Sequence, residues 1–477
     1  MACKIFRVGV FFDGTGNNQA RDGASESNVS KLNKLYKKGE FEINGQKVTC
    51  ASVYMNGVGT YDTWWEHHLH WIDRKYEKGG GGGGAERINE AINKILGLLQ
   101  KHPYGAGESD YKSREIDIFG FSRGAAMARD FINTFNTKSI ALELKHVKFN
   151  FIGIYDTVGS FGRPSNDVDR KPRDPKKHSE GDMNIFQAGN GDYGIQEHVG
   201  GGFFEPYNFD ISSGSAKKII HMTAHSEVRK NFPLYNSQGA GFQYNFLGVH
   251  SDIGGGYPER KSEKHQIPLP KVFTGSKGLG NLLHNQKAAT RAYGEKEIAR
   301  LKKEKNLLGK WYVEVDTTTH MGYRPDEYRA YLKRNKIVNN DLSDVTLHLM
   351  HEEAVNSKVP LNPITTEIPE SMKYYYAYVK ENKIHAYTYA EKADGHKINM
   401  NYVHHSAVDP AGISTNYYGD RGIIDILFND SADGGGNDAR YKGKNGGVID
   451  GRKNPKLADK VEREVYHNKT SEAVVPT

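Results

Sequence analysis

The sequence predicts an α/β fold, in which a mostly parallel central sheet carries helices on both faces. Two observations favour this fold class. Short apolar segments alternate with helical segments, which is the pattern of a parallel sheet covered on both sides. The 53 glycines, the 37% hydrophobic content and the mean hydropathy of −0.70 indicate a large domain with many loops and a very polar surface.

The first two predicted strands cover residues 4–12 and 47–55, and each ends at a glycine-containing loop. An unbroken glycine run at 79–84, flexible by composition, leads from them to an amphipathic helix over 87–100. Apolar residues recur along this helix at the three-four spacing of one face, namely at Ile88, Ala91, Ile92, Ile95, Leu96 and Leu99.

The next strand is predicted over 116–121, and it runs through a short turn into a helix over 125–135. Three further strands are predicted, over 148–154, 217–224 and 243–249. In a parallel sheet, ligands bind at the edge where the strands end. We therefore expect four loops to converge on that edge, those that hold Asp13, Ser122, Asp156 and His250.

Residues 1–260 are predicted to form the core domain. From 261 to 400, Lys, Glu and Tyr become frequent and strands are harder to recognise, which predicts a cap, an insertion or a membrane-docking module. Residues 401–432 are predicted to hold a last strand and a loop that returns to the core, and 433–477 to form a loop-rich tail. The aromatic runs at Trp64–Trp71 and Tyr374–Tyr378 suit either a lipid surface or core packing.

Charge and cysteine content exclude several classes of protein. The net charge of +7 is a mild excess, and the basic clusters lack interleaved aromatic residues, so no nucleic-acid partner is expected. Two cysteines exclude a disulfide scaffold. The N-terminus runs into a strand without a signal peptide, and no apolar run approaches the ~20 residues that span a bilayer. We therefore expect synthesis in the cytoplasm and, if the protein is exported, a route without a cleaved signal.

The segment Gly120-Phe121-Ser122-Arg123-Gly124 carries the strongest chemical signal. Between a strand and a helix, Gly-x-Ser-x-Gly is typical of the nucleophile elbow of serine hydrolases. The turn is sharp enough to strain the serine backbone, and the flanking glycines let the helix approach the strand. Ser122 is therefore the candidate nucleophile, and a small residue in a tight turn is the alternative interpretation.

A serine hydroxyl needs an imidazole base and a carboxylate that orients the base. His250 follows a predicted strand, whereas His404 and His405 follow residues 398–403, a possible last strand. The order Ser, Asp, His along the chain is kept by Asp156 with His250 and equally by Asp252 with His405. The residues alone leave both pairs open.

The backbone N–H groups of Gly14 and Arg123 are the candidate oxyanion donors, because one lies in a glycine-rich turn at the same edge and the other follows Ser122. No Gly-Lys-Ser/Thr follows that turn, which argues against a nucleotide site. The histidines at 67–70 lack carboxylates at metal-binding spacing beyond Glu66, and no clear calcium motif is present. No metal and no cofactor are therefore predicted.

Several motifs, taken in order, resemble the signatures of one protein family. The matching segments are 10–18 (FDGT-x-N), 54–60 (Y-x-x-GVGT), 80–88 (a glycine-rich lead into a helix), 120–125 (GFSRGA), 155–159 (DTVG), 224–232 (faintly, DERR-x-x-F) and 249–257 (HSDVGGGY). This is the bacterial and fungal α/β-hydrolase family that includes the first group of type VI secretion lipase effectors. The match spans roughly residues 5–260, with a weak echo at 404–406.

The resemblance implies an α/β-hydrolase-like fold and a serine-dependent phospholipase of A1 or A2 type, injected into rival bacteria. It maps the catalytic triad onto Ser122, Asp156 and His250. It also implies a phospholipid membrane as substrate, and as partners a cognate immunity protein and a VgrG-like spike or tube protein. The expected location is the periplasm or cytoplasm of the target cell, peripheral at membranes. A soluble carboxylesterase or thioesterase, or a non-catalytic binding module on the same fold, are the alternatives.

Overall fold

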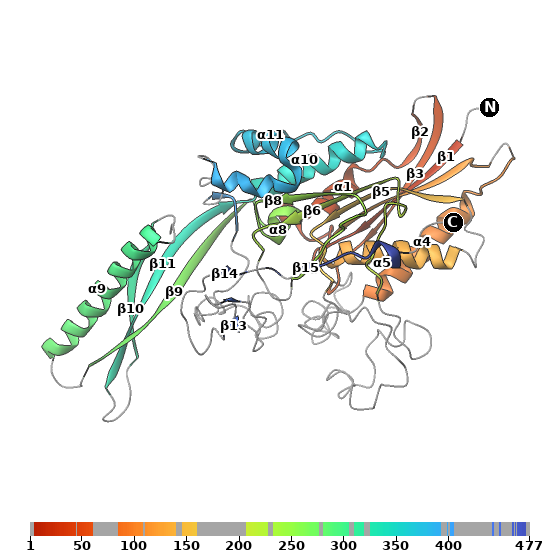
Figure 1. Cartoon of the computed structure of the whole chain (residues 1–477). Coiled ribbons are helices and arrows are strands. Elements are labelled where there is room, and N and C mark those ends of the chain that lie inside the picture. Colours follow the sequence, from red (N-terminus) through yellow and green to blue (C-terminus); the bar gives the residue numbers. More distant parts are fainter. Residues whose placement is uncertain are drawn as a thin grey trace, which may run out of the picture.

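The computed structural model describes residues 4–43, 45–60, 84–107, 110–139, 146–159, 207–227, 232–275, 280–304, 310–318, 325–392, 398, 401–404, 441–442, 448–449, 460–461, 463 and 465–473. A seven-stranded sheet forms the centre of the molecule, and helices cover both of its faces (Figure 1). The predicted α/β class with a mostly parallel sheet is confirmed. The Trp64–Trp71 run and His405 lie outside the described residues.

The strand order in the sheet is β2-β3-β1-β4-β5-β6-β8. The strands are β1 (Lys4–Phe12), β2 (Gly39–Ile43), β3 (Gln46–Met55), β4 (Ser113–Phe121), β5 (Val147–Tyr155), β6 (Lys218–Ala224) and β8 (Phe242–Phe246). The edge strand β2 pairs antiparallel with β3, and all other neighbours are parallel. Since Phe12 lies opposite both Met55 and Gly120, the carboxyl ends of these central strands are level.

Helices α4 (Gly84–Lys101) and α5 (Arg123–Ser139) cover one face of the sheet (Figure 1). The apolar stripe predicted on α4 is buried there, with Ile88, Ala91, Ile92, Ile95 and Leu99 in the core. The opposite face packs against α1 (Asn28–Leu35), α8 (His250–Gly254), α10 (Asp341–Asn356) and α11 (Lys373–Asn382). The 3-10 helices η3 (Glu370–Met372) and η4 (Lys383–Glu391) also belong to this layer, and a further one, η1 (Gly23–Ser25), precedes α1.

The direction of chain progress through the sheet reverses between β1 and β4. After β1 the chain adds β3 on one side, and it then returns to place β4, β5, β6 and β8 on the other. In open α/β sheets, ligands bind in the crevice outside the strand ends at such a reversal. This topology therefore predicts a ligand-binding site at the loops after Phe12 and Phe121.

A long arm extends away from the central sheet (Figure 1). It consists of β9 (Arg260–Gly275), α9 (Gly280–Glu304), β10 (Tyr312–Thr318) and β11 (Asp326–Asn339). The three strands pair antiparallel in the order β10-β11-β9. The arm has a small apolar cluster of its own, built on Leu269, Leu301, Ala330 and Leu332.

The stretch from 261 to 400, predicted as one module, therefore divides in two. Its first part is the arm, whereas α10 and α11 belong to the core, because their apolar side chains cover the sheet face that α4 and α5 leave open. Within the tyrosine run, Tyr375 is fully buried and its Oη accepts the backbone N–H of Leu247, while Tyr374 is 78% exposed. Most of this run thus packs against protein.

The described residues of the C-terminal tail include four two-residue strands, β12 (Tyr441–Lys442), β13 (Val448–Ile449), β14 (Lys460–Val461) and β15 (Val465–Tyr466), and a 3-10 helix, η6 (Thr470–Glu472). Strand β15 pairs in parallel with β7 (Leu234–Tyr235), so the end of the tail is attached to the core domain. None of the helices in the described part of the chain is both long and apolar enough to cross a bilayer.

Candidate active site

Ser122 lies at the turn between β4 and α5, with a backbone φ of +60°. A non-glycine residue in this left-handed region is strained, and such strain is concentrated at functional sites. The backbone on both sides fixes the turn: the N–H of Ser122 donates to the carbonyl of Tyr155 at 3.0 Å, and its carbonyl accepts from Val158 at 3.2 Å. The predicted strand–turn–helix context of Ser122 is thus present.

The two glycines around Ser122 are required by close backbone contacts. A Cβ added to Gly120 would lie 2.7 Å from the Cα of Ala125, and one added to Gly124 would lie 2.2 Å from the carbonyl oxygen of Phe12. Real Cβ atoms do not approach backbone so closely. Glycine at both positions therefore lets α5 start directly against β4 and the end of β1.

Asp156 and His250 form a hydrogen-bonded pair beside this turn. Asp156 follows β5 with a φ of +40°, and its Oδ2 lies 2.6 Å from Nδ1 of His250, the first residue of α8. The ring of His250 also packs on that of Phe121, next to Ser122, with centroids 4.7 Å apart. The loops after β4, β5 and β8 therefore bring Ser122, Asp156 and His250 to one place.

The three side chains are enclosed by protein. Ser122 is 4% exposed, His250 3% and Asp156 not at all. In this conformation only a small part of the serine is open to solvent. An imidazole hydrogen-bonded to a buried carboxylate at Nδ1 leaves Nε2 to accept a proton, which is the arrangement a serine nucleophile needs.

Arg463, in the C-terminal tail, binds the Asp156 carboxylate with both terminal nitrogens. Its Nη1 donates to Oδ1 at 2.7 Å and its Nη2 donates to Oδ2 at 2.8 Å. The contact of Arg463 with Asp156 was not predicted from sequence, because the two residues lie 307 positions apart and Arg463 is in a polar segment without a regular pattern. An arginine in a polar tail gives no indication in the sequence that it binds a buried carboxylate.

The charge state of Asp156 follows from these contacts. Burial acts to raise the pKa of Asp156, but the positive charge of Arg463 and the hydrogen bond from His250 outweigh it and hold the pKa well below its ordinary value. The carboxyl is therefore ionised at neutral pH. Behind it, His221 is buried near Arg129, and burial lowers the pKa of His221 to about 3, so this imidazole stays neutral.

A second aspartate–histidine pair lies on the other side of α8. Asp252 accepts from Nδ1 of His404 at 2.6 Å, from the backbone N–H of His404 at 3.1 Å and from that of Val249 at 2.9 Å. The ring of His404 stacks on Tyr257, and its Nε2 is buried without a hydrogen-bond partner in the described part of the molecule. Asp252 thus pairs with the neighbour of His405, the histidine considered from sequence.

The loop after β1 carries the candidate oxyanion donor Gly14. Its N–H donates to Oδ1 of Asp13 at 2.7 Å, so this group is already engaged. The next N–H, that of Thr15, meets no acceptor among the described residues, and the Thr15 hydroxyl accepts from Nη1 of Arg123 at 2.9 Å. Arg123 therefore joins the loop after β1 to the first turn of α5.

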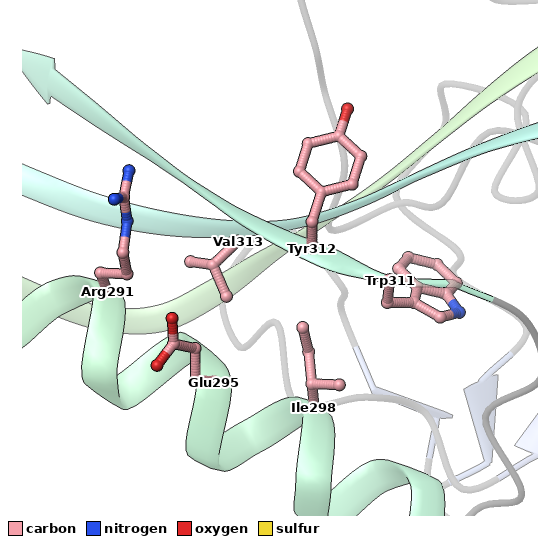
Figure 2. Close-up of a pocket in the computed structure, with 6 residues that line it drawn as sticks. All are labelled: Arg291, Glu295, Ile298, Trp311, Tyr312 and Val313. Carbon is pink, nitrogen blue, oxygen red and sulfur yellow. The ribbon is translucent and has the colours of Figure 1, made fainter.

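No three His, Cys, Asp or Glu side chains within the described ranges are grouped so as to hold a metal ion. A pocket of about 450 Å³ lies on the arm between α9 and β10, lined by Arg291, Glu295, Ile298, Trp311, Tyr312 and Val313 (Figure 2). These residues belong to the arm, whereas Ser122, Asp156 and His250 lie at the edge of the central sheet.

Residues 7–137 and 133–273 match the family model "T6SS, Phospholipase effector Tle1-like, catalytic domain", and the two ranges together cover more than half of the chain. The chain belongs to this family. The resemblance inferred from the motifs is thereby confirmed. Phospholipase effectors of the type VI secretion system are lipid ester hydrolases, and the matched region contains Ser122, Asp156 and His250.

Among solved structures, the chain is similar to the Tle1 effector bound to the VgrG spike from the type VI secretion system. The identity is 20%, the TM-score is 0.55, and the match covers 86% of this chain and 85% of that one, which shows a shared fold. A second similar structure is an uncharacterized protein from Pseudomonas aeruginosa, with 18% identity and a TM-score of 0.38 over 80% of this chain and 51% of that one. No curated protein matches the chain.

Proposed function

We propose that this phospholipase effector is a serine-dependent lipid hydrolase with Ser122 as nucleophile, His250 as general base and Asp156 as the residue that orients the base. The observation that carries the proposal is the strained Ser122 turn beside the 2.6 Å Asp156–His250 pair. Both are placed by parallel strands at the edge where α/β sheets bind ligands.

In the proposed reaction, Ser122 Oγ attacks the acyl carbonyl carbon while His250 Nε2 takes the hydroxyl proton. As the ester bond breaks, the imidazolium returns that proton to the leaving alcohol oxygen, and an acyl-serine ester remains. A water molecule then attacks the acyl-serine with the same base, which releases the fatty acid and restores the serine. Asp156 stays ionised throughout and stabilises the imidazolium.

The negative charge on the tetrahedral intermediate requires N–H donors. The N–H of Arg123 belongs to the first turn of α5, where N–H groups have no acceptor within the helix, and it directly follows the nucleophile. From the loop after β1, the N–H of Thr15 is better suited than that of Gly14, which donates to Asp13. We assign the oxyanion site to Arg123 and Thr15, with the Arg123–Thr15 side-chain bond fixing their separation.

The substrate proposed here is a membrane phospholipid of rival bacteria, cleaved at the first or second acyl position. The solved effector of the same fold is bound to a VgrG spike, so a spike or tube protein is the proposed carrier and a cognate immunity protein the proposed inhibitor in the producing cell. The proposed site of action is the target-cell periplasm or cytoplasm, at the membrane surface.

The arm is proposed to dock on anionic lipid. Residues 260–339 hold 18 Lys and Arg against 8 Asp and Glu, an excess larger than the net +7 of the whole chain. Basic clusters of this kind are attracted to anionic membranes by about 1 kcal/mol per residue. Two residues that line the arm pocket, Trp311 and the 45% exposed Tyr312, have rings suited to the lipid–water boundary (Figure 2).

A fluorophosphonate probe and phospholipid vesicles test the chemistry together. Wild type is expected to become covalently labelled and to release fatty acid from anionic vesicles. Ser122→Ala is expected to lose labelling and at least about a thousandfold of the fatty-acid release. Equal release by both proteins would remove Ser122 from the mechanism. A folded wild type that takes no label would favour a binding module, and activity on soluble short esters alone would favour a carboxylesterase.

Two aspartate variants separate the alternative acids. Asp156→Asn is expected to lose about 10⁴-fold in kcat, because the amide cannot hold the imidazole in the required tautomer. Asp252→Asn is the matched control: it weakens the bond to His404, its side-chain oxygen can still accept the N–H of Val249 at the start of α8, and it removes no atom of the Asp156–His250 bond. If Asp252→Asn proved the more damaging change to kcat in a folded protein, the pair with His404 or His405 would replace the one proposed.

A further inference from the structure

Arg463 is held in a fixed position by four hydrogen bonds. Besides the two to Asp156, its Nε donates to the carbonyl of Phe232 at 2.7 Å and its Nη1 to that of Ala224 at 3.2 Å. Its side chain is 7% exposed. Planar guanidinium groups that bind carboxylates in this two-pronged way fix geometry as well as charge.

The segment that follows Arg463 is attached to the core domain at two places. Strand β15 pairs with β7, and the rings of Tyr466 and Tyr235 stack with centroids 4.7 Å apart. Two residues further on, Asn468 exchanges hydrogen bonds with the backbone of Ile211 at 2.8 and 2.9 Å. The arginine is therefore delivered to Asp156 by a docked stretch of chain.

The Asp156 carboxylate receives four donors, two on each oxygen. Oδ1 accepts from the N–H of Ala224 and from Arg463, while Oδ2 accepts from His250 and from Arg463. With Arg463 removed, each oxygen keeps one of its two donors, Oδ1 that of Ala224 and Oδ2 that of His250, so the two-pronged bond no longer helps to fix the rotation of the carboxylate. Without the guanidinium charge beside the pair, a protonated His250 meets less repulsion, which favours the imidazolium.

Other charged groups surround the imidazole. Glu227, buried on the loop after β6, accepts the backbone N–H of His250 at 3.2 Å. Asp252 lies on α8 itself and is paired with His404. Near Asp156 lie His221, which is neutral, and Arg129, which donates to the backbone carbonyls of Tyr235 in β7 and of Asn236 after it. Among the described residues, Arg463 is the cation in direct contact with the carboxylate of the pair.

We propose that Arg463 is a positioning residue of the active site: it fixes the orientation of the Asp156 carboxylate and keeps His250 unprotonated at neutral pH. Through Arg463, the C-terminal tail thus contributes to the site. This inference rests on the proposed function, because it assigns to His250 the role of base.

The test is the pH dependence of fluorophosphonate labelling of the full chain, which reports the base of the free enzyme without a membrane. In Arg463→Gln the midpoint of the acid limb is expected to move up by about one pH unit, since the compensating cation is gone. In Arg463→Lys the charge is kept and the two-pronged bond is lost. Its midpoint is expected to stay near that of wild type, while the maximal labelling rate falls about tenfold.

Lys101→Ala, which removes a cation from the exposed end of α4, is the control and is expected to change neither quantity. An unshifted midpoint in folded Arg463→Gln would overturn the inference. If that variant does not fold, Arg463→Lys decides: wild-type midpoint together with wild-type rate would overturn it as well. Absence of labelling in wild type would instead refute the proposed function.

Discussion

Backbone strain at single residues marks the proposed site. Five non-glycine residues in the described chain have positive φ, and two of them are Ser122 and Asp156. Each such residue costs of order 1–3 kcal/mol and persists only where the surroundings impose it. Here the surroundings are hydrogen bonds: the Ser122 backbone is tied to Tyr155 and Val158, and the N–H of Asp156 donates to Met222 at 2.7 Å.

Asp13, next to the oxyanion loop, gives a pH-dependent prediction. It is fully buried, and burial outweighs its hydrogen bonds from Ser27, Tyr54 and Gly14, which raises its pKa to about 6. The unfolded value is near 3.9. Because the folded state binds this proton more tightly, the contribution to stability is full below about pH 4 and is lost as the pH rises to about 6.

Asp13→Asn removes this titration and keeps the side-chain shape. The melting temperature of the variant relative to wild type is therefore expected to rise between pH 4.5 and pH 7, by an amount equivalent to up to about 2 kcal/mol. All other titrating groups cancel in the comparison of the two proteins at each pH. A constant difference in melting temperature across this range would contradict the assigned pKa.

The candidate site could be predicted from sequence to the extent that its residues lie at strand ends in recognisable motifs. The Ser122 turn, Asp156 and His250 have this property. Arg463 does not, because its position depends on the docking of β15 on β7, a tertiary contact between two-residue strands.

At the scale of elements, the site depends on the contact between β4, α5 and the end of β1. Gly120→Ala places a Cβ 2.7 Å from backbone atoms of Gly124 and Ala125. Neither can move without displacing the Ser122 turn. We expect a loss of more than about 2 kcal/mol of unfolding free energy and a loss of fluorophosphonate labelling.

Gly97→Ala on α4 is the matched control, because a Cβ there meets nothing within 4 Å and the residue is helical. Alanine is favoured over glycine within a helix, so this variant is expected to gain about 0.5–1 kcal/mol and to keep full labelling. Denaturant unfolding and probe labelling measure both effects. Equal stability of the two variants would show that the Gly120 contact tolerates a side chain.

The buried strands of the central sheet could be predicted from sequence, whereas the strands of the arm could not. Strands β1, β4 and β5 are buried almost throughout, so their apolar runs identify them. In β10 the exposure alternates along the strand, and its outward residues are Tyr312, Glu314, Asp316 and Thr318. Only one side of this strand is covered, by α9, so it lacks the continuous apolar run of the buried strands.

At the scale of the whole molecule, charge is unevenly distributed. The core domain holds the proposed chemistry, while the excess of basic side chains lies on an arm that extends away from it (Figure 1). A lipid hydrolase that works on a bilayer must bring its nucleophile to an interface. A cationic arm at some distance from the site can hold the protein at the surface while a phospholipid enters the site.

Three charge reversals on the exposed side of α9 test this division of labour: Lys296→Glu, Lys302→Glu and Lys303→Glu in one protein. At about 1 kcal/mol for each basic residue near an anionic surface, the partition coefficient onto vesicles rich in phosphatidylglycerol is expected to fall at least about 100-fold. Hydrolysis of a soluble ester is expected to stay unchanged, since no residue at Ser122 is altered.

The matched control reverses three exposed lysines of the core, Lys47, Lys101 and Lys148, with the same change in net charge. If both triple variants lost vesicle binding equally, net charge rather than the arm would govern docking, whereas unchanged binding of the α9 variant would remove the arm from the membrane contact altogether.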